Sequence, residues 1–245
     1  MESILEVKGV TKAFGGVKAL NNASLTVTSG KITALIGPNG SGKSTLFEII
    51  SGLQKQDHGK IYFMNKEITG LSAYRIANQG IARTFQQVRL FKNLELADHI
   101  EFALNNDDTN FFKNLFTKTK LKEEQLRIAL DRVGLDKRAD TLAHNLSYGQ
   151  RKLLDLAVAL AKPHELLMLD EPVAGVTPKL RTEIKKILLE EKKEGKSILL
   201  IEHDMEFVMD IADVVYVLAQ GEIIAKGPPS QVKKNKAVLE AYLGE

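Results

Sequence analysis

Hydrophobic and polar positions change their spacing along the chain, and each change marks a different kind of element. Residues 4–8 and 23–29 show partial alternation of apolar and polar side chains, which predicts short antiparallel strands with a turn at Gly15-Gly16 between them. Residues 32–36 form a continuous apolar run, as in a strand that is buried on both faces. The first part of the chain is therefore predicted to be rich in strands.

Helical spacing takes over from about residue 89 to residue 161. Apolar side chains fall on one helical face near 96–104 and again near 126–133, where Gly134 is well placed to end the helix. The polar stretch from Asn105 to Lys120 carries four apolar side chains, namely Phe111, Phe112, Leu115 and Phe116. These side chains either form an adhesive surface for a membrane or a partner, or pack onto the neighbouring helices.

Strands and helices alternate again after Pro163. Apolar runs at 166–169, 198–201 and 214–218 suit a buried parallel sheet, and an amphipathic helix at 180–193 connects the first two. The pattern therefore predicts the α/β class, with a mostly parallel sheet, an N-terminal antiparallel β region and an inserted α-helical subdomain.

The same pattern predicts the division of the chain. We expect a single domain over 1–245, in which 1–88 and 162–245 form the α/β core and 89–161 form the helical subdomain.

A phosphate-binding pattern, G-x-x-x-x-G-K-[ST], stands directly after the apolar run 32–36 and before a helix-compatible stretch. Glycines let such a loop turn its N–H groups toward an oxyanion, Lys43 supplies a full positive charge for the phosphates, and Ser44 is placed to ligate Mg²⁺. A glycine-rich turn without a ligand would not explain why Lys43 and Ser44 occupy the last two fixed positions of this pattern. The core is thus predicted to be that of a P-loop NTPase, with nucleotide bound by Gly37, Pro38, Asn39, Gly40, Ser41, Gly42, Lys43, Ser44 and Thr45.

Two carboxylates, Asp170 and Glu171, follow the apolar strand predicted at 166–169. An isolated pair of this kind is usually a solvated strand end, but after a P-loop it has the arrangement of a Walker B segment. At the carboxyl end of a parallel strand, Asp170 can reach the Mg²⁺ shell and Glu171 can act on an attacking water.

Four further positions indicate a function only in combination with the motifs above. Ser147, in the stretch Leu-Ser-Tyr-Gly-Gln before a helix at 151–161, would by itself be a helix cap. Gln86 would be a surface amide, and His203 a histidine at a strand end. Phe14 could stack on a flat base, although large aromatic side chains are more often buried.

With the P-loop, Gln86, the Leu-Ser-Tyr-Gly-Gln stretch, Asp170-Glu171 and His203 in this order, the whole chain resembles the ATP-binding-cassette family. The resemblance implies ATP and Mg²⁺ as cofactors, adenine stacking by Phe14, and Gln86 as a Mg²⁺ ligand and water sensor that faces a membrane partner. It implies that Glu171, His203 and Gln86 are catalytic. It also implies that the γ-phosphate held by an opposite subunit is contacted by Ser147, Gly149 and Gln150.

Within that family, residues 81–91, 174–178 and 241–245 look like the ATPase subunit of branched-chain amino-acid importers. Two positions depart from the family pattern: Tyr148 replaces a glycine, and Thr177 stands where Asp or Asn is common. Thr177 before Pro178 is also a good helix cap. The alternatives are the ATPase of a lipopolysaccharide exporter and a non-transport cassette protein, although the latter usually joins two cassettes or carries a long coiled coil.

Composition adds limits to this interpretation. The chain has no cysteine, which suits a reducing cytoplasm, and its start lacks the order of a signal peptide. The longest apolar run, Leu156 to Ala161, is far shorter than the roughly 20 residues that span a bilayer. The net charge is +3, and Lys and Arg are scattered among Asp and Glu. This mild basic excess is compatible with a nucleic acid or an anionic membrane surface, but we expect an ordinary solvated surface and no nucleic-acid partner.

The partners that the resemblance implies are a second ATPase subunit, identical or different, polytopic permease subunits and, indirectly, a substrate-binding protein. The expected location is the cytoplasmic face of the plasma membrane.

Overall fold

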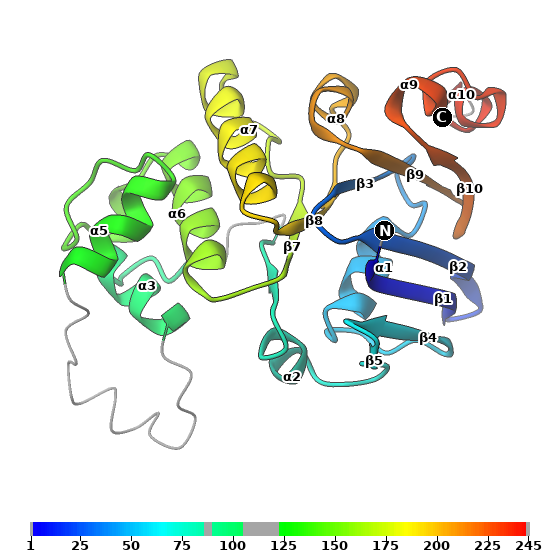
Figure 1. Ribbon diagram of the computed structural model, residues 1–245, viewed down its shortest axis with the longest axis horizontal. Helices are drawn as coiled ribbons and strands as arrows, with labels where there is room; N and C mark the ends of the chain where they lie inside the picture. Colours follow the sequence, from blue (N-terminus) through cyan, green and yellow to red (C-terminus); the bar gives the residue numbers. More distant parts are fainter. Residues whose placement is uncertain (1, 86–89, 105–122, 244–245) are drawn as a thin grey trace. The chain divides into compact units, whose positions relative to one another are not determined.

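The structure is a computed structural model that describes residues 2–85, 90–104 and 123–243 (Figure 1). The chain packs as two compact units. The first contains residues 1–86, 164–174 and 188–245, and the second contains residues 87–163 and 175–187.

A six-stranded sheet forms the centre of the first unit. In spatial order its strands are β10 (Glu222–Gly227), β9 (Val214–Ala219), β3 (Ile32–Ile36), β8 (Ser197–Ile201), β7 (Leu166–Asp170) and β6 (Ile81–Arg83). All neighbouring pairs are parallel except β10 and β9. Strands β3, β7 and β8 are buried at every position, as their continuous apolar runs predict.

A second, antiparallel sheet is built from the start of the chain. Its order is β2 (Val17–Thr28), β1 (Ser3–Phe14), β4 (His58–Phe63) and β5 (Lys66–Glu67). Strands β1 and β2 are longer than the predicted 4–8 and 23–29, because register shifts between them interrupt the regular alternation that marks a strand in sequence.

The helices of this unit are α1 (Lys43–Ile50), α2 (Ala73–Ala77), α8 (Met205–Ile211), α9 (Pro229–Val232) and α10 (Lys236–Leu243). Helix α1 contributes the buried Leu46, Phe47 and Ile50 to one hydrophobic core that also takes side chains from both sheets. The helix that begins at the P-loop is thereby fixed between the two sheets, and the loop before it is held by the core.

The second unit is helical. It contains α3 (Leu96–Leu104), α5 (Glu123–Arg132), the short 3₁₀ helix η2 (Ala143–Asn145), α6 (Tyr148–Ala161) and residues 178–187 of α7 (Pro178–Lys193). The predicted apolar faces are buried at Leu96, Ile100, Leu126 and Leu130. Gly134, with φ of 67°, is the second residue after the end of α5. The α/β class with an antiparallel N-terminal sheet and a helical insertion is confirmed, whereas the four apolar side chains within 105–120 lie outside the described residues.

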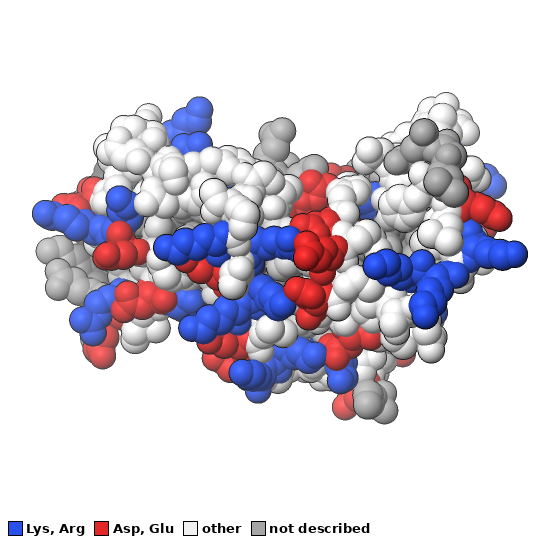
Figure 2. Space-filling model, turned by 90° about the horizontal axis from the view of Figure 1, so that it is seen from above, with Lys and Arg blue, Asp and Glu red and all other residues white. Residues whose placement is uncertain are grey.

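Charged side chains of both signs are intermingled on the face drawn in Figure 2, as their scatter along the sequence suggests. None of the helices in the described ranges has the length and apolar character needed to cross a membrane.

Candidate functional site

The P-loop runs from the end of β3 to the start of α1, and its backbone accepts only glycine at two positions. A Cβ atom at Gly37 would lie 1.9 Å from the carbonyl oxygen of Leu218, and one at Gly42 would lie 2.4 Å from the carbonyl oxygen of Ala19. Both residues also have positive φ, 151° and 104°. The loop is therefore fixed by backbone on two sides, from β9 and from β2.

Lys43 is the first residue of α1 and is 6% exposed. Its Nζ donates to the carbonyl oxygens of Gly37 and Pro38, each at 2.7 Å. The helix is capped by Gly42, which makes no side-chain capping bond, so no side-chain oxygen of the cap accepts from the first-turn N–H groups. An ammonium group and a helix N-terminus at one loop form a cradle that suits phosphate.

The turn between β9 and β10 supports this loop from outside. The N–H of Gly221 donates to the carbonyl oxygen of Ser41 at 3.0 Å, and the carbonyl oxygen of Gly221 accepts from the N–H of Asn21 at 2.9 Å. The turn thus connects the P-loop to β2. Sequence reasoning missed this contact, since residues 41 and 221 are far apart along the chain.

Asp170 ends β7 and is 4% exposed. Its Oδ2 lies 3.3 Å from Nη2 of Arg83, whose Nη1 donates to Oγ of Ser51 at 2.6 Å. The predicted metal ligand therefore lies beside a largely buried guanidinium that comes from the neighbouring strand β6. No local sequence pattern predicted this contact of Arg83 with Asp170.

Glu171 and His203 meet at the carboxyl ends of the adjacent strands β7 and β8. Oε1 of Glu171 lies 3.0 Å from Nε2 of His203, and their side chains are 17% and 40% exposed. Glu171 has φ of 50°, a left-handed conformation that is strained for a residue with a side chain. Two groups that can accept and donate a proton thus face each other at the edge of the sheet where α/β proteins bind ligands.

A third acid, Glu202, precedes His203 in the chain and is 2% exposed. Burial raises the pKa of Glu202 above its usual value, against the backbone N–H groups of Val173, Asp204 and His203, which lower it. The sequence places Glu202 next to His203 but gives no reason for a buried carboxylate there, so this residue was also missed.

In the second unit, Ser147 caps α6 through a reciprocal pair of hydrogen bonds with Gln150. Ser147 Oγ accepts from the N–H of Gln150 at 3.3 Å, and the N–H of Ser147 donates to Oε1 of Gln150 at 3.0 Å. The capping role of Ser147 is confirmed. Its hydroxyl proton and the Gln150 amide group keep the capacity to donate to an anion.

Tyr148 lies against Gly175 in the loop before α7, and Gly149 lies against Leu180 in the first turn of α7. A Cβ atom at Gly149 would lie 2.7 Å from Cδ2 of Leu180, and one at Gly175 would lie 3.5 Å from Cε1 of Tyr148. The ring of Tyr148 thus packs against the side of Gly175 where another residue would carry its Cβ atom. The surrounding hollow of about 420 Å³ is lined by Ser147, Tyr148, Gly149, Gln150, Leu153, Gly175, Val176, Thr177, Lys179, Leu180 and Glu183.

Thr177 caps α7, as predicted from the Pro178 that follows it. Its Oγ1 accepts from the N–H of Leu180 at 3.3 Å, and its carbonyl oxygen accepts from the N–H of Arg181 at 2.9 Å. A role of Thr177 toward a second subunit stays a prediction.

Two predicted site residues have other outcomes. Gln86 lies outside the described residues. Phe14 is 46% exposed, so burial in the core was the wrong expectation. It ends β1 at the hairpin tip, where the Nζ of Lys12 lies 5.3 Å from the centre of its ring.

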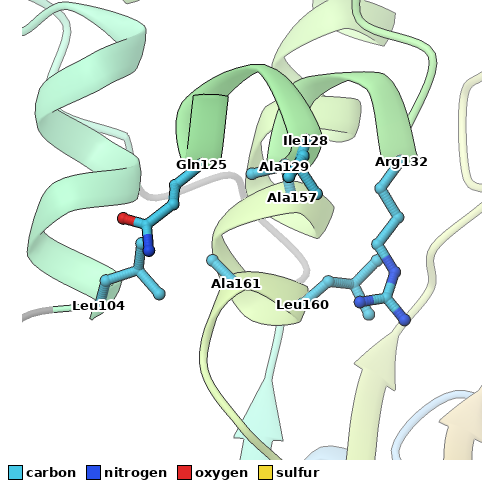
Figure 3. Close-up of a pocket in the computed structure, with 8 residues that line it drawn as sticks. All are labelled: Leu104, Gln125, Ile128, Ala129, Arg132, Ala157, Leu160 and Ala161. Carbon is cyan, nitrogen blue, oxygen red and sulfur yellow. The ribbon is translucent and has the colours of Figure 1, made fainter. Parts of the chain in front are cut away.

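A smaller hollow of about 180 Å³ lies among three helices of the second unit (Figure 3). Its lining is mainly apolar, with Gln125 and Arg132 as the polar members, and consists of Leu104, Gln125, Ile128, Ala129, Arg132, Ala157, Leu160 and Ala161. None of these residues was predicted to bind nucleotide.

The described residues contain no group of three His, Cys, Asp or Glu side chains that could hold a metal ion by themselves. A site of this kind would suit Ca²⁺ or Zn²⁺ better than Mg²⁺, which commonly takes one or two protein oxygens together with phosphate oxygens and water. Ser44 and Asp170, placed after β3 and at the end of β7, are a donor set of that type.

Comparison with known proteins agrees with these features. The family described as ABC transporter matches residues 20–174, and the one described as branched-chain amino acid ATP-binding cassette transporter matches residues 222–245. The high-affinity branched-chain amino acid transport ATP-binding protein LivG of Escherichia coli K12 is 38% identical over 252 residues, covering 100% of this chain and 99% of LivG.

Two solved structures share the fold. A nucleotide-free ATP-binding cassette from an ABC transporter has a TM-score of 0.87 and 36% identity, and the match covers all of both chains. A dimeric cassette in a post-hydrolysis state, bound to ADP and Pi, has a TM-score of 0.78 and 26% identity over 92% of this chain and 98% of the other.

The chain therefore belongs to the ABC transporter family. Within it, the chain is a nucleotide-binding ATPase cassette, and its sequence is similar over its full length to the ATP-binding proteins of branched-chain amino acid transport.

Proposed function

We propose that this chain is the ATP-hydrolysing subunit of an importer for branched-chain or similar amino acids. The observation that carries the proposal is similarity to LivG over the whole of both chains, together with the match of residues 222–245 to a branched-chain amino acid cassette family. The C-terminal match matters because it lies outside the nucleotide-binding motifs that all cassettes share.

Nucleotide binding is assigned to the P-loop. Phosphate oxygens would compete with the carbonyl oxygens of Gly37 and Pro38 for the ammonium group of Lys43, and the first turn of α1 offers backbone N–H groups. Mg²⁺ would be held by Ser44 and Asp170, with Gln86 as a further predicted ligand, and would neutralise charge that develops on the phosphates. Phe14, exposed at the tip of the β1–β2 hairpin, is available to stack on adenine.

Hydrolysis is assigned to Glu171 and His203. In this proposal Glu171 accepts a hydrogen bond from the attacking water and polarises it, while His203 orients Glu171 and donates toward the phosphate. Their 3.0 Å separation supports a shared task, since one group fixes the direction of the other.

The active unit is proposed to be a pair of cassettes. Ser147, Gly149 and Gln150 of one subunit would contact the γ-phosphate that Lys43 of the other subunit holds. The dimeric state of a related cassette supports this arrangement. The partner is either a second copy of this chain or a different cassette.

Coupling to transport is assigned to permease subunits that receive the motion of the pair through Gln86 and the residues that follow it. The substrate-binding protein would act only through those permeases. The chain would then lie on the cytoplasmic face of the membrane, bound through its partners.

Uptake in the native host tests this function. Deletion of the gene should abolish uptake of labelled leucine, isoleucine and valine at low external concentration, and re-expression of the parent chain should restore it. Re-expression of Glu171→Gln should not. Uptake of a labelled sugar serves as the control, and unchanged amino-acid uptake after deletion would refute the assignment.

A further inference from the structure

Glu202 is one of the most buried acids among the described residues of the first unit, and three backbone N–H groups donate to its side chain. Oε1 accepts from the N–H of Val173 at 2.9 Å. Oε2 accepts from the N–H of His203 at 3.1 Å and from that of Asp204 at 3.4 Å. The two oxygens therefore hold two different segments of the chain.

Both segments carry residues assigned to hydrolysis. Val173 is two residues beyond Glu171, in the turn that follows β7, and His203 is the second residue after the end of β8. A single carboxylate thus connects the turn of Glu171 to the turn of His203, and the side chains of these two residues lie 3.0 Å apart.

The turn of Glu171 requires such support. Its φ of 50° is unfavourable for a residue with a side chain, and strained backbone of this kind persists only where the surrounding contacts determine it. The N–H of Glu171 donates to the carbonyl oxygen of Ile201, and the N–H of Ala174 donates to the carbonyl oxygen of Glu171. The bond from Val173 to Glu202 fixes the residue between these two contacts.

We infer that Glu202 is a positioning residue for ATP hydrolysis, which holds Glu171 and His203 in register through the backbone of their two turns. The inference rests on the proposed roles of Glu171 and His203. Glu202 itself touches neither nucleotide nor water in this role. A buried carboxylate is unfavourable unless it is fully hydrogen bonded, and here its bonds serve the two turns.

Glu202→Gln is the decisive variant because it keeps the shape of the side chain. A carboxamide has one acceptor oxygen and one NH₂ group, so one of the two turns must face a donor instead of an acceptor. The matched control is Glu191→Gln, which changes another buried acid of the same unit; Glu191 is 1% exposed and lies 3.5 Å from Nε2 of His164, away from the predicted site residues.

The experiment measures kcat and KM for ATP, the ATP Kd by calorimetry and the melting temperature of both full-length variants and of the parent chain. Displacement of catalytic groups by about 1 Å can cost about 100-fold in rate, so Glu202→Gln should lower kcat by about 10-fold to 100-fold. The ATP Kd should change by less than about twofold, because the P-loop is unaltered. Glu191→Gln should lower the melting temperature and leave kcat within about twofold.

Hydrogen exchange provides the second measurement. In the parent chain the amides of Val173 and His203 should be protected, and at least one of them should exchange faster in Glu202→Gln than in Glu191→Gln. The inference is overturned if kcat of Glu202→Gln stays within about twofold of the parent, or if Glu191→Gln loses as much activity at an equal loss of melting temperature. A parent chain that hydrolyses ATP but drives no amino-acid uptake would refute the proposed importer alone.

Discussion

The contact between the β9–β10 turn and the P-loop gives a prediction that the structure makes quantitative. Gly221 has φ of 81°, and a Cβ atom there would lie 2.9 Å from the carbonyl oxygen of Ala19, 3.0 Å from Cα of Leu20 and 3.1 Å from the nitrogen of Asn21. All three are backbone atoms of β2, which cannot turn aside as a flexible side chain would.

Gly221→Ala therefore combines two effects. The left-handed conformation costs an alanine about 1 to 2 kcal/mol, and overpacking against backbone adds about 1 to 3 kcal/mol. The hydrogen bond from Gly221 to Ser41 contributes about 1 kcal/mol, so its loss is not counted as a separate cost. We expect the free energy of unfolding to fall by about 2 to 5 kcal/mol.

Gly195→Ala separates the two effects. Gly195 has φ of 85°, but a Cβ atom there would meet nothing within 4 Å, so this control has the conformational cost alone. Urea denaturation should show that Gly221→Ala loses at least about 1 kcal/mol more than Gly195→Ala.

Nucleotide affinity completes the test. Because the turn bonds to the carbonyl oxygen of Ser41, Gly221→Ala should move the P-loop and weaken ATP binding in calorimetry, whereas Gly195→Ala should bind as the parent does. Equal unfolding free energies for the two variants, together with unchanged ATP affinity in both, would refute the argument that the turn supports the loop.

Three further predictions concern single side chains. Lys43→Ala should weaken ATP binding by about 1.5 to 3 kcal/mol in calorimetry, since it deletes charge-assisted hydrogen bonds, and an unchanged Kd would exclude it from the phosphate site. Glu171→Gln should accumulate as an ATP-bound dimer in sedimentation and return to monomer when Ser147→Arg is added; a monomer with ATP beside its partner cassette would contradict the composite site. Burial by itself would raise the pKa of Asp213, but the hydrogen bond from Lys192, together with further hydrogen bonds and charges, has the larger effect and lowers the pKa below its usual value of 3.8. Ionised Asp213 therefore stabilises the fold above pH 3.8, and this stability is lost as the pH falls through the lower pKa of the folded state. Acid titration of Asp213→Asn, followed by circular dichroism, should lack this part of the transition, and an identical titration curve would refute it.

The parts of the site that follow from sequence are those encoded within a few consecutive residues. The P-loop and the Asp170-Glu171 pair each contain their own structural context, a buried strand followed by polar residues, so their positions at the sheet edge are confirmed. The caps at Ser147 and Thr177 are local as well, and both are formed.

The parts that sequence could not supply depend on strand register between distant residues. Arg83 reaches Asp170 only because β6 pairs with β7, and Glu202 reaches Val173 only because β8 lies beside β7. Burial, which is usual for large aromatic side chains and was the alternative to adenine stacking at Phe14, does not occur because Phe14 ends β1 at the hairpin tip. Local hydrophobic periodicity predicts the strands but not which strands pair, so neither the β6–β7 nor the β7–β8 pairing could be predicted from it.

The capping box at Ser147 has a consequence for the entropy of association. Ser147 and Gln150 hold each other through two hydrogen bonds within a single subunit. Ordering a side chain at an interface costs about 0.5 to 1.5 kcal/mol, and a loop that is already ordered avoids that loss when it meets a partner. In the proposed dimer this loop is therefore already ordered before the subunits meet, because folding has already cost the entropy of ordering it. The free energy of closing the dimer then depends chiefly on the ATP between the subunits.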